Sequence, residues 1–255
     1  DLAVDISKAD EDVECIPFAG KTVEAAFAEA VAFINARAPG LRSVAVGCYG
    51  PFDTIDKTLR GTSGYGRLQA TTHEARLLSG KSLPELLSGI GGKFKSVPIT
   101  VMPDVAVAAI GELYHRGTRE GRWLPGGRDM IIVFIKISVG FGGGVVRAAE
   151  PWEGRHHPEM GQVRVERWRG DAQEAAFAGT CRYHGACLEG LASVIAIEER
   201  YKPLTFAQLR DQPDHVCWER EAFYIAQACI AATSILAPDQ IVLGGRVMGV
   251  PGLLE

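Results

Sequence analysis

Several features that define whole classes of proteins are missing from this sequence. No uninterrupted apolar run approaches the roughly 18 residues needed to cross a bilayer, and residues 1–20 carry Asp and Glu where a signal peptide has a basic start and an apolar block. Cysteine is scarce, with 6 among 255 residues, so a disulfide scaffold is not expected. These absences predict a cytoplasmic protein that has no membrane partner.

A dominant charge of one sign is also lacking. The 27 Lys and Arg residues nearly balance the 31 Asp and Glu residues, and the formal net charge is -4. A protein that binds nucleic acid through a broad positive field needs a basic excess, so nucleic acid is not an expected partner. Hydrophobic residues make up 47% of the chain, which is too many for a disordered segment. The composition therefore predicts a globular protein with a sizeable core.

Helix and strand patterns alternate along the chain. Apolar spacing predicts helices at 22–37, 105–114, 188–200 and 219–236. Short apolar runs predict strands at 43–48, 98–102, 130–137 and 240–243. The run at 130–137 is apolar almost without alternation, as in a strand covered on both faces. This order predicts an α/β protein with a largely parallel sheet and two lobes, 1–117 and 118–255, because the composition changes at 115–128.

Three glycine-rich turns directly follow predicted strands, at 50–53, 138–144 and 244–245. The second contains four glycines, which allow a tight backbone excursion before extended structure resumes at Val145. Glycine lets backbone N–H groups approach phosphate oxygens, and ligands of such sheets bind beyond the carboxyl ends of the strands. A single turn of this kind is more often a simple turn or bulge. Three together favour a nucleotide site.

Asp104 follows Pro103 at a strand end and precedes a helix of small residues. One interpretation is a helix N-cap, because Asp accepts the free N–H groups of a first turn and complements the helix dipole. The other is a general base that takes a proton from an attacking hydroxyl. Spacing alone favours the cap, and both roles are compatible.

The sharpest local signal is Cys181-x-x-His184-x-x-Cys187. Two thiolates and an imidazole within seven residues suit tetrahedral zinc, which still requires a fourth ligand. The candidates for that ligand are His156, His157 and Asp171. The alternative is two unpaired buried cysteines and a surface histidine. Small core residues are the better interpretation of Cys15, Cys48, Cys217 and Cys229.

Seven segments carry a resemblance to a known family. They are GCYGPFD at 47–53, YG at 65–66, PDVAVAAIGE at 103–112, GFGGG at 140–144, HPEMG at 157–161, CRYHGACLEGLAS at 181–193 and APDQIVLGG at 237–245. In this order they resemble the ROK family of sugar kinases, particularly its bacterial fructokinase branch. The HPEMG and CxxHxxCxEGLAS stretches are the most specific, because both are hard to obtain by chance.

The resemblance implies two ribonuclease-H-like lobes, as in actin and the hexokinases, with ATP and sugar meeting in the cleft between them. It implies ATP-dependent phosphorylation of a hexose, with fructose the leading acceptor, Mg²⁺ shared among phosphate oxygens, and a homodimer. In this scheme Asp104 matches the catalytic base. Other hexoses and polyols remain possible acceptors.

The resemblance also implies roles for other residues. Expected sugar ligands are Glu159, Gln162 and Glu189. Expected nucleotide contacts are Gly140, Gly142, Gly143, Gly244 and Gly245. The expected zinc ligands, in a loop at 157–187 that holds the sugar-binding segment, are Cys181, His184, Cys187 and His157.

Some positions depart from the family pattern. Val139 replaces a hydroxyl donor in the second phosphate turn, where a β-branched side chain can crowd a phosphate. Gln162 replaces a histidine that contacts the sugar and binds zinc; its amide can bind a hydroxyl but is a poor zinc ligand. Ala106 replaces an asparagine near the base. The first phosphate hairpin, D/E-x-G-G-T-K, is expected to be missing, and the chain stops at Glu255 before further family elements.

Three hypotheses follow. A sugar kinase is favoured because Asp104, Glu159 and Glu189 occur together, and a protein that only bound sugar would not need the base. A non-catalytic or repurposed family member that binds a sugar-like ligand is supported by Val139 and Gln162. A transcriptional regulator would need a helix-turn-helix domain, which the sequence does not show, and it is the least favoured.

Overall fold

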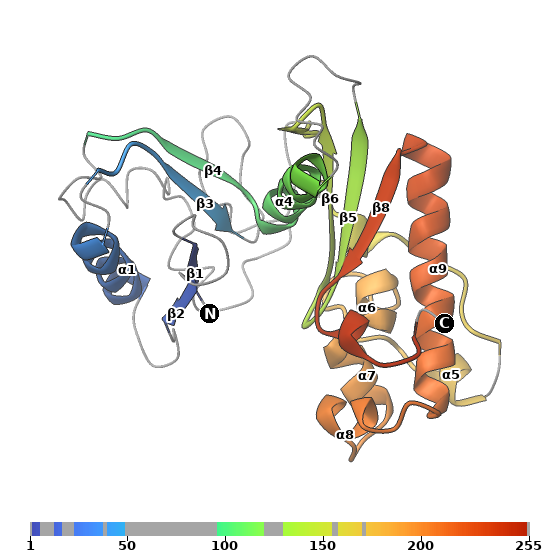
Figure 1. The fold of residues 1–255 in the computed structure, drawn as a ribbon. Coiled ribbons are helices and arrows are strands. Elements are labelled where there is room, and N and C mark those ends of the chain that lie inside the picture. The colour runs from blue at the N-terminus through green and yellow to red at the C-terminus, as the bar shows by residue number, and fades with distance from the viewer. Residues whose placement is uncertain are drawn as a thin grey trace. The chain divides into compact units, whose positions relative to one another are not determined.

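The computed structural model describes residues 2–5, 13–16, 23–37, 40–48, 96–119, 130–154, 158–169 and 172–253 (Figure 1). The chain divides into two compact units, Asp1–Met102 and Pro103–Glu255. The lobe boundary expected near residue 117 stays a prediction. Among the described residues, no helix has both the length and the apolar character needed to cross a membrane.

In the described part of the first unit there are short strands and one helix. Strand β1 (Leu2–Asp5) pairs antiparallel with β2 (Val13–Ile16), and β3 (Val44–Cys48) is hydrogen-bonded to β4 (Ile99–Pro103). Helix α1 (Val23–Arg37) buries Phe27, Ala30 and Val31, which recur at the spacing of one helix face. The helix predicted at 22–37 and the strands predicted at 43–48 and 98–102 are therefore confirmed. The turn predicted at 50–53 lies outside the described residues.

A mixed four-stranded sheet forms the centre of the second unit, in the order β7-β6-β5-β8. The three antiparallel strands are β5 (Ile131–Ile137), β6 (Phe141–Arg147) and β7 (Glu150–Pro151), whereas β8 (Gln240–Gly244) pairs parallel to β5. The expectation of a largely parallel sheet is wrong for this unit. Residues 138–140 alone connect β5 to β6, and so short a connection permits only a hairpin, because parallel neighbours need a crossover.

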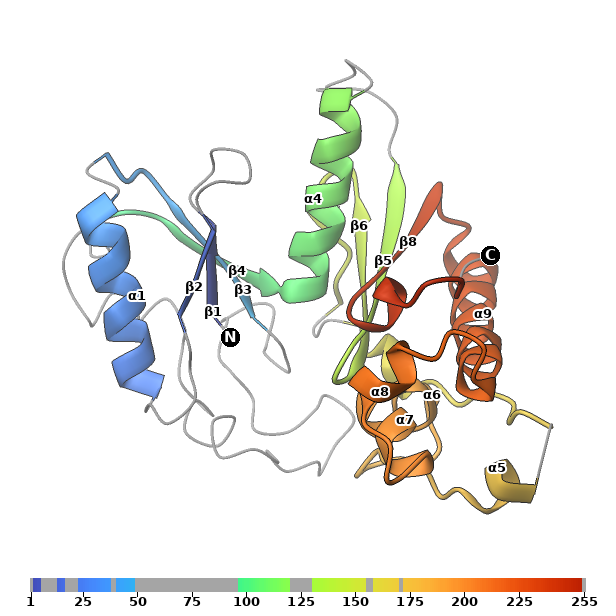
Figure 2. The same ribbon diagram turned by 60° about the horizontal axis from the view of Figure 1, so that its bottom comes forward.

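Helices cover both faces of β5, as its apolar run predicted. Ile132 and Phe134 belong to a cluster with Ala109 of α4 (Asp104–Arg119). Val133 and Ile135 point to the opposite face and join the main hydrophobic core. Figures 1 and 2 show α4 and the long C-terminal helix on opposite sides of the sheet. Even-numbered positions of β5 therefore face α4, because successive side chains of a strand alternate between faces.

The remaining described helices follow the hairpin. They are η2 (Met160–Gln162), α5 (Ala172–Ala176), α6 (Leu188–Ala192), α7 (Val194–Arg200), α8 (Phe206–Arg210), α9 (Val216–Leu236) and η3 (Val247–Gly249). The single helix predicted at 188–200 is broken at Ser193, whose backbone is extended (φ -81°, ψ 162°) and whose side chain accepts the N–H of Ala196. A serine at this point caps the start of α7 and so separates two helices.

Three of the four glycines expected in a loop lie instead inside β6. Extended structure resumes at Phe141 and not at Val145, so the expected excursion is limited to 138–140. The reason is close packing: a Cβ on Gly144 would lie 2.5 Å from the backbone carbonyl carbon of Val105 at the start of α4. A Cβ on Gly143 would overlap the side chain of Met160. These glycines let α4 and η2 approach the strand.

Candidate functional site

Asp104 lies where β4 ends and α4 begins. Its Oδ1 accepts the backbone N–H of Val105 at 2.9 Å, so its predicted place at the helix start is confirmed. Its Oδ2 accepts a hydrogen bond from the Nζ of Lys136 at 2.7 Å. The Asp104 side chain is 35% exposed. It is therefore accessible to a ligand and held at both oxygens, which suits a group that must keep one orientation.

Lys136 is the residue that the sequence analysis missed. It is the only charged residue in the run at 130–137, and a charge in an otherwise buried strand requires a partner. This isolated charge is the feature of the sequence from which Lys136 could have been identified as a candidate site residue. Its side chain is 44% exposed and faces α4, where it meets Asp104.

The register of the sheet places Lys136 between two glycines predicted to contact nucleotide. Lys136 is opposite Gly142 of β6 and opposite Gly244 of β8. Paired residues of neighbouring strands share one face of a sheet. The positions Gly142, Lys136 and Gly244 therefore form one row on the face that carries α4.

Of the other predicted nucleotide glycines, Gly143 lies inside β6 and packs against Met160, whereas Gly140 and Gly245 lie at strand ends. Gly140 closes the hairpin, where Ser138 donates its N–H to the Gly140 carbonyl at 2.8 Å. Gly245 has φ +98°, and a Cβ there would overlap the carbonyl oxygen of Ile137 at the end of β5. A non-glycine residue would be strained in that conformation. Val139, at the tip of the hairpin, is 52% exposed.

The three predicted sugar ligands lie close together. Glu189, in the first turn of α6, accepts the N–H of Phe141 at 3.4 Å and that of the Gln162 amide at 3.5 Å. Burial raises the pKa of Glu189, the Phe141 N–H opposes this rise, and the charge of Glu159 adds to it. Two carboxylates and an amide thus form a polar cluster beside the β5–β6 hairpin. Such groups can accept and donate hydrogen bonds to several hydroxyls.

The predicted zinc residues also converge. One ligand atom each from Cys181, His184 and Cys187 lies within 4.8 Å of the others. Burial raises the pKa of the Cys187 thiol to about 12, so metal binding would have to displace its proton. The loop is tight because Gly179 and Gly185 have positive φ values of 83° and 60°. The donor set at these three positions fits zinc.

The fourth zinc ligand has several candidates in the sequence. Three of them, His156, His157 and Asp171, lie outside the described residues. The Oε1 of Gln162 lies 2.6 Å from His184 Nδ1 and 3.6 Å from Cys181 Sγ. Gln162 therefore joins the zinc residues to the sugar cluster through Glu189. An amide oxygen is a harder donor than structural zinc usually takes.

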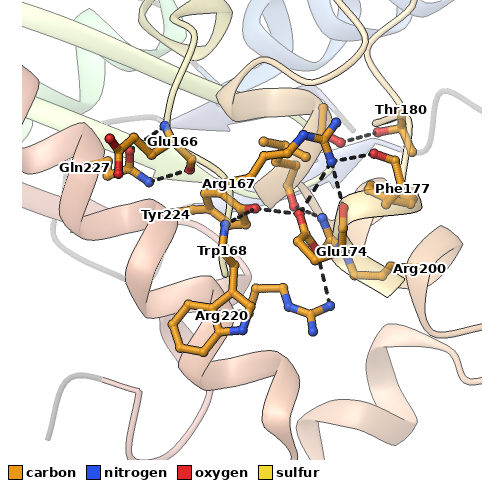
Figure 3. Close-up of polar contacts among 12 residues, drawn as sticks. Glu166, Arg167, Trp168, Glu174, Phe177, Thr180, Arg200, Arg220, Tyr224 and Gln227 are labelled. Atoms are coloured by element: carbon orange, nitrogen blue, oxygen red, sulfur yellow. Dashed lines mark hydrogen bonds and ion pairs between the residues drawn. The ribbon is translucent and has the colours of Figure 1, made fainter. Parts of the chain in front are cut away.

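A buried ionic cluster fastens the segment between Gln162 and Cys181 to the helices (Figure 3). The Glu174 carboxylate is fully buried; it lies 2.9 Å from Arg200 Nε and 3.3 Å from an Arg220 nitrogen. The Tyr224 hydroxyl donates to it at 2.5 Å. Contacts to α7 and α9 thus hold the loop that carries the zinc residues.

Comparison with known proteins identifies the family. The ROK family profile matches residues 17–255. This chain belongs to the ROK family. A fructokinase of Streptococcus mutans is 31% identical over 243 residues, which cover 95% of this chain and 75% of that protein. A fructokinase of Lactococcus lactis is 35% identical over 159 residues.

The match to these relatives covers only part of their length. The match covers 49% of the Lactococcus protein, and a match to a Bacillus subtilis relative covers 61% of that protein. The chain thus spans about half to three quarters of the length of these relatives.

Solved structures show the fold. A ROK hexokinase of Thermus thermophilus superposes with a TM-score of 0.65 at 22% identity, over 94% of this chain and 76% of that chain. A ROK glucokinase of Streptomyces griseus, solved with glucose and AMPPNP, gives a TM-score of 0.60 at 18% identity, over 91% of this chain and 75% of that chain. The predicted fold, two ribonuclease-H-like α/β lobes, is confirmed.

Proposed function

We propose that this protein transfers the γ-phosphoryl group of ATP to a hydroxyl of a hexose, with fructose as the leading acceptor. The observation that carries the proposal is the position of Asp104 in a ROK chain. It is a partly exposed carboxylate at the junction of a strand and a helix. The fructokinase names of the relatives support the choice of sugar.

Asp104 acts as general base in this proposal. It takes the proton of the sugar hydroxyl as the hydroxyl oxygen forms a bond to the γ-phosphorus. The bond from phosphorus to the bridging oxygen breaks, and its electron pair leaves with ADP. Val105 and Lys136 occupy two acceptor positions of Asp104, and an ionised carboxylate has about four. A hydroxyl can therefore bind without displacing either.

The remaining predicted residues supply binding. Glu159, Gln162 and Glu189 would hold the sugar hydroxyls. The nucleotide would contact Gly140, Gly142, Gly143, Gly244 and Gly245. Mg²⁺ would neutralise charge on the phosphate oxygens. A homodimer and a cytoplasmic location complete the proposal.

Zinc is part of the proposal as a structural ion. Cys181, His184 and Cys187 would hold it with His157 as the predicted fourth ligand. The position of Gln162 supports a second arrangement, in which its amide oxygen completes the set or hydrogen-bonds His184. In either case the ion would hold the segment that carries Gln162 against the loop at 181–187.

Release of ADP by the full-length protein tests this function. The assay uses Mg-ATP with fructose, mannose, glucose, N-acetylated hexoses and polyols. We expect sugar-dependent turnover that falls about 10²- to 10⁴-fold in Asp104→Asn, the usual contribution of a general base. Sugar affinity, measured by calorimetry, should be nearly unchanged in that variant, since the carboxamide keeps the shape of the side chain.

Asp211→Asn is the matched control, because Asp211 is an exposed aspartate beside Arg210. It should retain full activity. Full activity in Asp104→Asn would refute the base assignment. Absence of turnover with every sugar would instead support the non-catalytic alternative.

A further inference from the structure

Lys136 is the one charged residue of the otherwise apolar strand β5, and its flanking residues Ile135 and Ile137 are fully buried. Its own side chain is 44% exposed on the face that carries α4, so its ammonium group remains accessible to a ligand. The ion pair with Asp104 is also exposed, and exposed pairs contribute little stability. A ligand that binds the exposed ammonium group therefore explains this lysine better than the stability of the fold does.

The position of Lys136 relative to the chemistry indicates which ligand. A base lies about 3 Å from the hydroxyl it deprotonates, and that oxygen lies about 3–3.5 Å from the phosphorus it attacks. The phosphorus of the transferred group must then lie within about 6.5 Å of the Asp104 carboxylate. The Lys136 ammonium is 2.7 Å from that carboxylate, on a flexible stem.

Two further observations point in the same direction. Lys136 shares a row of the sheet with Gly142 and Gly244, both predicted to contact nucleotide. Val139 also leaves the second phosphate turn without the hydroxyl donor that the ROK pattern has there. A cation between those glycines would supply charge where that donor is missing. Without it, the Asp104 carboxylate would face the phosphates as an uncompensated like charge.

We propose that Lys136 is a phosphate-binding residue that pairs with Asp104 until nucleotide arrives and then contacts the terminal phosphate of Mg-ATP. This inference rests on the proposed function and adds a residue to it. Lys136 thereby neutralises negative charge on the phosphoryl group that is transferred. Asp104 keeps its hydrogen bond to the Val105 N–H and receives the sugar proton.

Nucleotide affinity is the decisive readout. Binding of Mg-AMPPNP to the full-length protein is measured by calorimetry for the wild type, Lys136→Met and Lys136→Arg. We expect Lys136→Met to weaken the affinity about 10- to 100-fold, the value of a hydrogen bond between charged groups. Sugar affinity should be unchanged. Lys136→Arg retains the charge and should recover part of the nucleotide affinity.

Lys202→Met is the matched control, because Lys202 forms an exposed pair with Glu199 at 2.7 Å. It should leave nucleotide affinity unchanged. Asp104→Asn adds a further check, since removal of the competing carboxylate should tighten Mg-AMPPNP binding. Steady-state kinetics should show a higher KM for ATP in Lys136→Met and an unchanged KM for sugar.

The outcomes separate this inference from the proposed function. An active wild type with equal Mg-AMPPNP affinity in Lys136→Met would overturn the inference and leave the kinase proposal intact. A wild type that is inactive on every sugar would refute the kinase proposal. In that case weaker Mg-AMPPNP binding in Lys136→Met would still support the phosphate role, and equal or undetectable binding would overturn it.

Discussion

At the scale of single residues, Glu174 has effects that extend over several elements. Its carboxylate contacts Arg200 and Arg220, and the three side chains are at most 1% exposed. Burial and the bond to Glu174 raise the pKa of Tyr224 from 10.0 to about 12, so its hydroxyl stays protonated and can donate even above its ordinary pKa. Water cannot replace any partner in such a cluster, and each charge depends on the others.

Glu174→Gln should therefore destabilise the protein by about 3–5 kcal/mol, because it leaves buried arginine charge uncompensated. Urea unfolding followed by circular dichroism measures this change. Glu166→Gln is the control: Glu166 is 73% exposed and its pair with Arg169 is 3.7 Å long. Such a pair contributes about 0–1 kcal/mol. Equal effects of the two substitutions would contradict the role assigned to Glu174.

At the scale of elements, glycine decides how closely α4 lies on the sheet. Gly144 of β6 faces the backbone at Val105 and Ala106, the first turn after Asp104. The distance between strand and helix start thus depends on the absence of one side chain. Since Asp104 and Lys136 belong to this helix and this sheet, the same contact sets the geometry of their pair.

Gly144→Ala should destabilise the protein by about 1–3 kcal/mol, because the new methyl group overlaps backbone that cannot move independently. Gly111→Ala is the control in α4, the helix that Gly144 faces, since a Cβ at Gly111 meets nothing within 4 Å. It should stabilise by up to about 1 kcal/mol through higher helix propensity. Thermal unfolding of the two variants measures these changes in stability. If Gly144→Ala is as stable as the wild type, the contact between β6 and α4 relaxes around the new methyl group, and the prediction is wrong.

The zinc loop gives a second prediction at this scale. Protein purified without added zinc should contain about one equivalent by elemental mass spectrometry. Cys187→Ser should lose the metal, and a chelator should lower the unfolding temperature of the wild type. Cys229→Ser is the control, as Cys229 lies outside the cluster. A metal-free and well-folded wild type would refute the zinc proposal.

At the scale of the whole molecule, the sequence predicted the longer described elements but not how they pair. Periodicity located the helices at 22–37 and 219–236 and the strand at 130–137 to within a few residues. It did not predict that 138–140 form a hairpin turn, because four nearby glycines suggested a longer loop. It also did not predict α5 or α8, each of five residues, which is too short for a periodic signal.

In the candidate site, too, some features could be predicted from the sequence and others could not. The sequence by itself determined the family, the helix start at Asp104 and the Cys181–His184–Cys187 group, since these signals lie within a few adjacent residues. Only the tertiary structure brought Lys136 to Asp104, Gln162 to His184, and Arg200 and Arg220 to Glu174. A local sequence pattern reflects the backbone preference of a segment and shows which of its faces is buried. Partners that lie 22 to 46 residues apart meet only when the sheet and its helices pack, and no local pattern encodes that contact.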